Sequence, residues 1–206
     1  MESELLKIFD EHKNQIGIAT REEVHRLGHW HEAFHCWFVS IENRTDYVYL
    51  QIRSENKKDY PNLYDITAAG HLLANETIDD GVREIKEELG IEVTIRDLVP
   101  LGQIKYCVLL NNFIDKEFAS VFLYKSKNDF HDFILQKEEV SGIVKAKFND
   151  FTQLWFGEID EIHVEGFEIN HSGSKSIINK KVNKSDFVPH DSSYYKSVIE
   201  MIKMNL

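Results

Sequence analysis

Acidic side chains gather in one short stretch of this sequence, residues 70–91, which reads GHLLANETIDDGVREIKEELGI. Glu84, Glu87 and Glu88 are spaced three and four residues apart, so on a helix their carboxylates lie on one side. Like charges placed in this way repel, whereas a hard divalent cation such as Mg²⁺ or Mn²⁺ prefers oxygen ligands of this kind. The alternative is a solvated acidic helix face balanced by Arg83 and Lys86, which is the usual explanation of such runs but does not account for the loop ahead of the helix.

A helix over about residues 78–89 is predicted to present these carboxylates. It ends at Gly90, and its apolar stripe consists of Ile78, Val82, Ile85 and Leu89. Arg83 lies four residues before Glu87 and can hold part of the carboxylate cluster. In the loop ahead of the helix, Gly70 has no Cβ, so its backbone carbonyl can approach a bound cation closely.

The whole chain is consistent with one globular domain. It has 206 residues, 42% of them hydrophobic, and a formal net charge of −11. This charge argues against nucleic acid and anionic membranes as partners. The charged beginning, MESELLKIFDEHK, is unlike a secretory signal, no apolar run reaches membrane-spanning length, and we expect a cytoplasmic protein. Cys36 and Cys107 lie in apolar runs and are expected to be buried, reduced thiols.

Alternating apolar patterns predict an α+β arrangement with short helices between strands. A hairpin (residues 5–19) precedes a short helix (20–28) with Thr20 as N-cap, Glu23 completing a capping box, and Gly28 at its end. Strands are expected at 33–41, 46–54, 66–75, 91–95, 98–110, 116–126, 161–169 and 176–182. Two further helices are expected at 149–157, capped by Asn149 or Asp150, and at 190–205.

The acidic stretch resembles the signature of the Nudix hydrolases. That signature is Gly, five residues, Glu, seven residues, Arg-Glu, an aliphatic residue, any residue, Glu-Glu, any residue, Gly and an aliphatic residue. The named positions are occupied, in order, by Gly70, Glu76, Arg83, Glu84, Ile85, Glu87, Glu88, Gly90 and Ile91. One departure is that six residues, and not seven, separate Glu76 from Arg83.

A wider resemblance joins roughly residues 1–160 to the Nudix branch related to isopentenyl-diphosphate isomerase. It rests on REEVHRLGHWHEAFHCWFV, LQIRS, KKDYPNLYDITAAGH and LQKEEV. The resemblance implies an α/β/α sandwich around a mixed sheet, with the catalytic loop–helix–loop on one side. Residues 1–206 would then form a single Nudix domain, with an N-terminal hairpin and helix (1–28), a core (29–157) and a C-terminal extension (158–206) packed on the core.

The family resemblance implies hydrolysis of a diphosphate linkage, in a nucleoside diphosphate derivative, by attack of water on phosphorus. Mg²⁺, with Mn²⁺ as a possible substitute, would be bound by Glu84, Glu87, Glu88 and the carbonyl of Gly70. Arg83 would orient these carboxylates, and Glu76 holds a further signature position. The general base would be one of the signature glutamates or Glu139, on a later loop.

Basic and polar side chains near the same loop are candidates for binding the diphosphate. They are Arg53, Lys57 and His71. The expected partner is therefore a small-molecule diphosphate, and a homodimer is possible because dimers are common in the family.

Two other functions stay open. The isomerases use a catalytic cysteine just before the Gly-His pair, but this chain has Ala69 there, so an isomerase-like reaction is disfavoured. His25, His31 and His71 lie at or near positions resembling histidine ligands of the isomerase metal, and a second metal site formed by them is an open alternative. A non-catalytic Nudix-fold binding module is the third function considered.

Overall fold

One long strand, β3 (Trp30–Glu42), organises the fold in this computed structural model. Its 13 residues are rich in aromatic and apolar side chains, and nearly all of them are buried. Such a continuous buried run is typical of a strand covered on both faces. Along its length β3 pairs with β1, β4, β6 and β8, so it lies at the centre of the sheet. The structure describes residues 3–110, 113–170 and 173–206.

Eleven strands of the described residues form one sheet. They are β1 (Leu5–Phe9), β2 (Gln15–Thr20), β3, β4 (Thr45–Arg53), β5 (Tyr64–Asp65), β6 (Ala68–His71), β7 (Leu98–Leu110), β8 (Phe113–Lys125), β9 (Val140–Lys147), β10 (Glu161–Ile169) and β11 (Lys175–Asn183). The longest path through the sheet is β11-β10-β9-β4-β3-β1-β2, and β7 joins through β8. The β3–β8 pair is parallel and the other pairs are antiparallel, so the sheet is mixed, as the resemblance implied.

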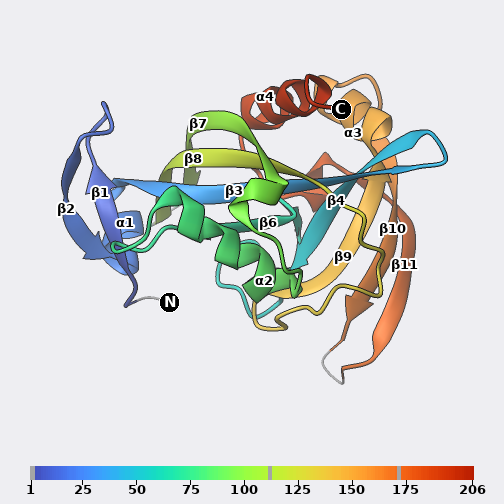
Figure 1. Cartoon of the computed structure of the whole chain (residues 1–206), viewed down its shortest axis with the longest axis horizontal. Coiled ribbons are helices and arrows are strands. Elements are labelled where there is room, and N and C mark those ends of the chain that lie inside the picture. The colour runs from blue at the N-terminus through green and yellow to red at the C-terminus, as the bar shows by residue number, and fades with distance from the viewer. Residues whose placement is uncertain (1–2, 111–112, 171–172) are drawn as a thin grey trace.

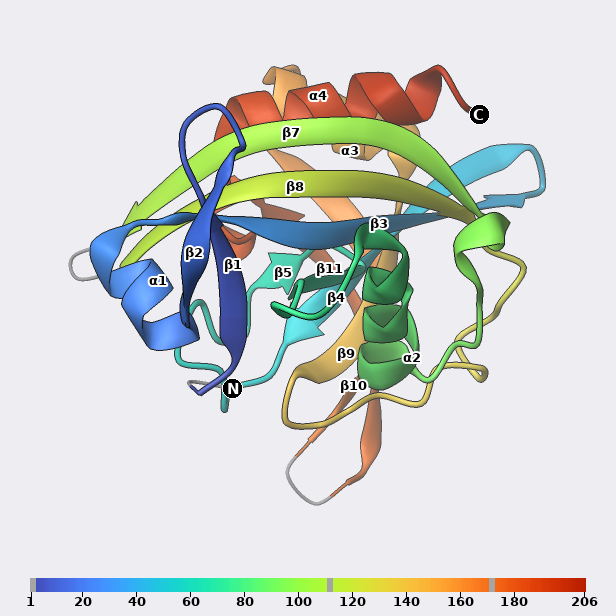
Figure 2. The same cartoon turned by 60° about the vertical axis from the view of Figure 1, so that its left-hand side comes forward.

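The helices lie on opposite sides of this sheet. They are α1 (Arg21–Leu27), α2 (Arg83–Leu89), α3 (Phe148–Phe156) and α4 (Ser192–Lys203). Figure 1 shows α2 on one side of β3 and the pair α3–α4 on the other, and Figure 2 shows α4 running along β7. Within the described residues, no helix is long and apolar enough to cross a membrane.

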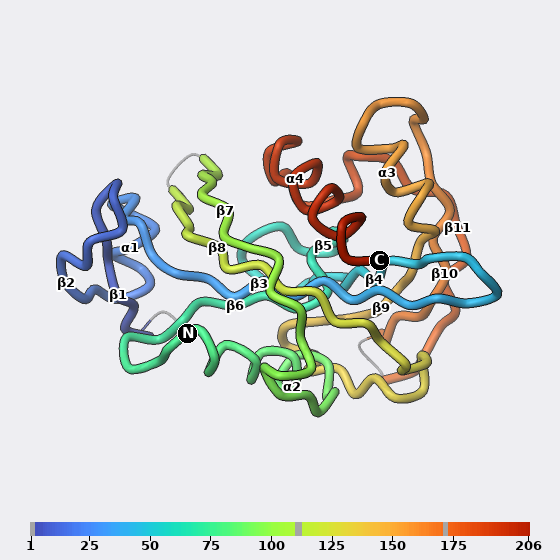
Figure 3. Tube along the Cα trace, turned by 45° about the horizontal axis from the view of Figure 1, so that its top comes forward, coloured from blue at the N-terminus to red at the C-terminus, as the bar shows by residue number. Residues whose placement is uncertain are grey.

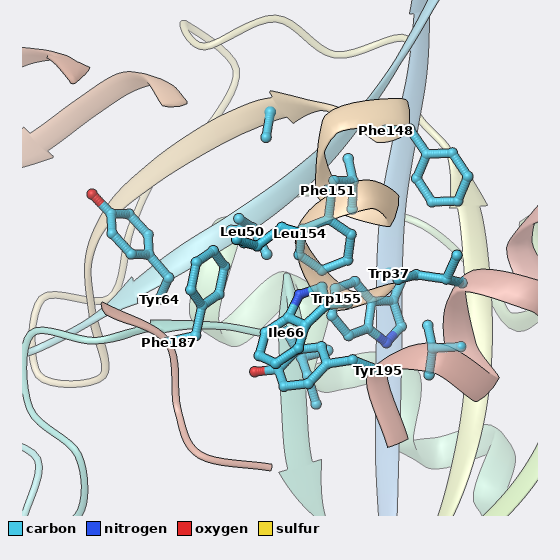
Figure 4. Packing of buried hydrophobic residues seen from close by; sticks show 14 of the residues in the cluster. Trp37, Leu50, Tyr64, Ile66, Phe148, Phe151, Leu154, Trp155, Phe187 and Tyr195 are labelled. Carbon is cyan, nitrogen blue, oxygen red and sulfur yellow. The ribbon is translucent and has the colours of Figure 1, made fainter. Parts of the chain in front are cut away.

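Apolar side chains fill the space between each helix layer and the sheet. On the α3–α4 side, Trp155 and Tyr195 stack with ring centroids 3.5 Å apart, close to Trp37 of β3 and to Phe187 (Figure 4). On the other side, Ile85 and Leu89 of α2 are fully buried against the sheet. The N-terminal hairpin β1–β2 lies at the end of the molecule far from β10 and β11 (Figure 3).

Several sequence predictions are confirmed and others are wrong in detail. The hairpin and the capping box of α1 are present, with Gly28 in the left-handed conformation at φ 70°. The signature helix is shorter than predicted because its first turn, Ile78–Val82, is 3₁₀ and the α-helix begins at Arg83.

Three expectations about single segments are corrected. Residues 91–94 form no strand, because the chain turns there into a short 3₁₀ segment, Ile95–Asp97. The N-cap position of helix α3 is Lys147, two residues before Asn149, and the helix already begins at Phe148, whose side chain is buried in the core. Cys107 is exposed, since its side chain lies on the outer face of β7, whereas Cys36 is buried as predicted.

Candidate functional site

A cavity of about 510 Å³ lies between α2, the loop 54–63, strands β6 to β8 and the C-terminal segment 187–190. The signature glutamates form one part of its wall. Asp115 and Glu117 of β8 form another part, and Val188 and His190 a third. Segments far apart in the sequence therefore contribute to one site.

Arg83 is the centre of the carboxylate cluster. Its guanidinium grips Glu76 with two hydrogen bonds, Nε to Oε1 at 2.5 Å and Nη2 to Oε2 at 3.0 Å. Its Nη1 donates to Glu84 at 2.6 Å and to Glu87 at 2.9 Å, and Nη2 donates to the carbonyl of His71 at 3.3 Å. A planar guanidinium suits such multidentate binding, and these are charge-assisted bonds. Arg83 thus fixes three of the signature glutamates in one geometry.

The backbone of Gly70 packs directly against the carboxylate of Glu84. A Cβ at Gly70 would overlap the carboxylate of Glu84, so a side chain at this position is incompatible with the observed arrangement. Glycine permits this close approach of backbone to carboxylate. The Gly70 backbone and the Glu84 oxygens together offer the oxygen-rich surroundings that a hard cation binds.

The electrostatics of the cluster are unusual for a helix surface. Burial raises the pKa of Glu84 to about 7, with nearby Arg83 opposing this shift and Glu87 adding to it. Burial also raises the pKa of Glu88 well above its usual range, and the Glu84 charge adds to the effect. Glu88 accepts hydrogen bonds from the Ala69 amide at 3.2 Å and from Gln51 at 3.4 Å. Buried carboxylates with raised pKa values are what a divalent cation would neutralise.

The predicted general base and substrate contacts also line the cavity. Glu139 is paired with Lys57, and both side chains are largely buried. Arg53 uses its donors within the protein, at 2.8 Å to the carboxylate of Asp65 and at 3.1 and 2.9 Å to the Asp59 carbonyl. Arg53 therefore holds the shape of the loop that carries Lys57, in addition to lining the cavity.

A second cluster of ligand-type atoms lies beside the first. His25, His31, His71 and Asp115 each offer one atom, and these four atoms lie within 4.8 Å of one another. The Nε2 atoms of His25 and His31 are 3.5 and 3.3 Å from Asp115 Oδ1. His71 Nε2 is 3.5 Å from Glu117 Oε1. The structure thus places His71 in the histidine cluster.

The hydrogen bonds of His25 and His31 determine which ring nitrogen of each is available to a cation. Nδ1 of His25 lies 2.9 Å from the Arg21 carbonyl, and Nδ1 of His31 lies 3.1 Å from the His29 carbonyl. A carbonyl only accepts, so each Nδ1 carries the hydrogen, and the lone pair of a neutral ring is on Nε2. Both Nε2 atoms and Asp115 Oδ1 are buried without a hydrogen-bond partner among the described residues.

This donor set fits a divalent cation such as Mn²⁺ or Zn²⁺. Such a metal takes imidazole nitrogens together with carboxylate oxygen, and its histidine ligands usually donate their second ring nitrogen to a carbonyl or carboxylate. Burial lowers the pKa of His71 to about 4, so this ring is neutral at pH 7, the form in which imidazole binds metal. Burial opposes the charged form of His31 as well, but the carboxylates of Asp115 and Glu117 raise the pKa of this ring. The observations that support the fit are the neutral ring of His71 and the three buried atoms that have no hydrogen-bond partner among the described residues.

Sequence reasoning missed the acidic partners of the histidines. Asp115 and Glu117 are two residues apart on β8, so both side chains point to the same face of the strand. The parallel register pairs His31 with Glu117 across the sheet. Two acidic residues at alternate positions of an otherwise buried strand were the available signal. His190 was also missed, because it lies between Phe-Val-Pro and Asp-Ser-Ser with no other ligand-type residue at a telling spacing.

No protein-family model matches the chain. The chain is 40% identical over 202 residues, 98% of either chain, to an uncharacterized Nudix hydrolase of Clostridium acetobutylicum. It is 29% identical over 161 residues to a prenyl-diphosphate phosphatase of Methanosarcina mazei, covering 75% of this chain and 92% of that one.

Two further likenesses concern the branch and the fold. An isopentenyl-diphosphate Delta-isomerase of Mycolicibacterium vanbaalenii is 29% identical over 132 residues, which are 63% of this chain and 71% of the isomerase. A crystal structure of a Deinococcus radiodurans protein aligns with a TM-score of 0.53 at 19% identity, covering 71% of this chain and 85% of that one.

The structure shows an α+β fold of the Nudix type, and the full-length relative supports a hydrolase that acts on diphosphate linkages. The relative that matches over the full length of the chain identifies the family, and the signature residues bound by Arg83 agree with it. The chain belongs to the Nudix hydrolase family, and its relatives include isopentenyl-diphosphate isomerases.

Proposed function

We propose that the protein cleaves the diphosphate linkage of a nucleoside diphosphate derivative, with Mg²⁺ as cofactor and Mn²⁺ as an effective substitute. The observation that carries this proposal is the grip of Arg83 on Glu76, Glu84 and Glu87 at the wall of the cavity. Carboxylates held in this way need a cation to offset their repulsion, and the diphosphate needs the same cation to approach a protein of net charge −11.

The ligands of this cation would be carboxylate oxygens of Glu84, Glu87 and Glu88 and the carbonyl of Gly70. When bound, the cation neutralises phosphate charge and polarises the phosphorus–oxygen bonds. In the reaction, water oxygen bonds to phosphorus, one anhydride phosphorus–oxygen bond breaks, and a proton of the water passes to a base. Glu139 suits this role because it lines the same cavity outside the ligand set. Lys57 holds its carboxylate in place.

Basic side chains around the cavity would bind the diphosphate. Lys57 lies on the loop that Arg53 shapes, and both line the cavity, so we propose that they contact phosphate oxygens directly. His71 contributes in a different way, through the histidine cluster. We propose that His25, His31, His71 and Asp115 bind a second divalent cation, with Glu117 completing the set.

The second cation has its own test, because metal content can be measured without turnover. His31→Gln keeps a polar side chain of similar length and is expected to reduce the tightly bound metal by about one equivalent in elemental analysis. His12→Gln changes an exposed histidine and serves as the control. Unchanged metal content in His31→Gln would contradict the assignment.

An isomerase-like reaction is the second candidate, and the histidine cluster is the observation that favours it. Ala69 opposes it, because its methyl group cannot move a proton and its amide is already bound to Glu88. A pure binding module is opposed by the intact signature, in which Arg83 binds Glu76, Glu84 and Glu87 and the Ala69 amide binds the fourth glutamate, Glu88.

The test is product formation from a panel of nucleoside diphosphate derivatives and isopentenyl diphosphate, with Mg²⁺ and with EDTA. Glu87→Gln removes one proposed ligand at a half-exposed position, so the fold should survive, and turnover should fall at least about 100-fold. Glu92→Gln, a change of an exposed glutamate after the same helix, should have no effect. Full activity of Glu87→Gln, or an isomer as the only product, would refute the proposal.

A further inference from the structure

Three cavity-lining residues carry a buried polar atom without a hydrogen-bond partner among the described residues. They are Asp115 Oδ1, Tyr60 Oη and His190 Nδ1. The first belongs to the histidine cluster. Tyr60 and His190 belong neither to that cluster nor to the signature glutamates. Buried polar groups are nearly always paired, so two such atoms in residues that line one cavity need an explanation.

His190 is held firmly in its place. The segment before it is joined to β5 by the amide of Val188, which donates to the Tyr64 carbonyl at 2.9 Å. His190 Nε2 lies 2.9 Å from Asp65 Oδ1, and Asp65 Oδ2 accepts from Arg53. Because a carboxylate only accepts, Nε2 carries the hydrogen, and Nδ1 is left as an unfilled hydrogen-bonding position.

Tyr60 is held by its loop in an uncommon backbone conformation. Its φ of 51° lies in the left-handed region, which a bulky residue seldom adopts. The loop is closed by the bond from the Asn62 amide to the Arg53 carbonyl, at 3.1 Å, and by the Arg53 side chain on the Asp59 carbonyl. The loop thus fixes the tyrosine, while its hydroxyl has no hydrogen-bond partner within residues 3–110, 113–170 and 173–206.

We propose that Tyr60 and His190 form a hydrogen-bonding subsite for the group attached to the diphosphate, and that this group is polar, such as a sugar or a nucleoside. This inference rests on the proposed hydrolysis and deepens it. A hydrocarbon group would leave both buried atoms unpaired, and a site built to hydrogen-bond its substrate rejects analogues that cannot do so. The subsite would therefore select against prenyl diphosphates, the substrate class for which the Methanosarcina relative is named.

The experiment compares kcat/KM for ADP-ribose and UDP-glucose with that for isopentenyl and geranyl diphosphate. The wild-type protein should prefer one of the polar compounds by at least about 100-fold. Tyr60→Phe deletes a single oxygen and should lower kcat/KM for that compound about tenfold, while leaving the prenyl diphosphates unaffected. His190→Gln should shift the preference in the same direction. Tyr47→Phe, on β4 outside the cavity lining, is the matched control.

The outcomes separate this inference from the function on which it rests. If the wild-type protein cleaves none of these diphosphates with Mg²⁺ or Mn²⁺, the proposed hydrolysis fails and the subsite falls with it. If cleavage occurs and depends on Glu87, but prenyl diphosphates are preferred, the subsite and the nucleoside part of the proposed substrate are overturned, whereas the cation-dependent hydrolysis of a diphosphate stands. A polar-to-prenyl ratio unchanged in both Tyr60→Phe and His190→Gln would overturn it as well.

Discussion

Replacing Arg83 by lysine tests the central contact of the site most directly. Lysine keeps the positive charge but has one nitrogen, so it cannot grip both oxygens of Glu76 and reach Glu84 at the same time. The side chains of Arg83, Glu76 and Glu84 are 29%, 10% and 13% exposed, so solvent screens the bonds between them little. The side chain of Glu87 is half exposed, so solvent weakens its bond to Arg83.

The size of the effect follows from these contacts. A hydrogen bond to a charged group contributes about 1.5–3 kcal/mol, and the lysine variant loses at least one of them. Since about 1.4 kcal/mol corresponds to a factor of ten, kcat/KM should fall roughly 10- to 150-fold.

The assay is steady-state hydrolysis of the best compound from the panel, with Mg²⁺ varied at saturating substrate. The concentration of Mg²⁺ for half-maximal rate should rise, because Glu84 and Glu87 are no longer held together. Arg96→Lys changes an exposed arginine and controls for the substitution itself. If kcat/KM and the Mg²⁺ concentration for half-maximal rate of the Arg83→Lys variant both stay within about threefold of the wild-type values, the guanidinium of Arg83 does not organise the site.

Three further outcomes are expected. Gly70→Ala should reduce activity at least about tenfold through the steric clash with the neighbouring signature carboxylate, whereas Gly17→Ala, where a Cβ meets only ordinary contacts, should not. Asp65→Asn should lower the free energy of unfolding in urea by about 3–5 kcal/mol at pH 7. Burial alone would raise the pKa of the Asp65 carboxyl, but the hydrogen bond from His190 and the charge of Arg53 hold this pKa well below its usual value. The carboxylate therefore stabilises the folded protein fully above about pH 4 and loses this contribution as the pH falls. The difference in unfolding free energy between wild type and Asp65→Asn should shrink at lower pH. Cys107 should react with a thiol reagent in the folded protein, and Cys36 should react only after unfolding. Cys36 is fully buried, and burial raises the pKa of its thiol well above the usual value. Equal reaction rates of the two thiols in the folded protein would contradict this prediction.

The parts of the fold that the sequence predicted are those with short-range causes. The capping box of α1 needs only Thr20 and Glu23, three residues apart, and the structure contains it. The grip of Arg83 on Glu87 is likewise an (i, i+4) contact within one helix. Such features follow from local spacing, and the family signature marks where they occur.

The parts that could not be predicted depend on the register between distant strands. Asp115 meets His25 and His31 only because β8 runs parallel to β3, a pairing that no local pattern encodes. The wrong strand at 91–95 has a similar cause, since its alternation of apolar and polar residues is real but the sheet offers it no neighbour. His190 reaches the cavity through a bond to β5, more than 100 residues earlier, and no short pattern reports it.

The attachment of segment 187–190 to β5 has a bearing on how enzymes of this kind diversify. The groups proposed to handle the cation and the diphosphate all precede residue 140, whereas His190 comes from a later tail segment, which the Val188 amide joins to the Tyr64 carbonyl and the His190 ring joins to Asp65. Changes in this tail can alter what the cavity accepts while leaving the hydrolytic groups untouched. During synthesis, the proposed hydrolytic groups and Tyr60 leave the ribosome before His190 does. The part of substrate choice that depends on His190 is therefore encoded apart from the hydrolytic groups.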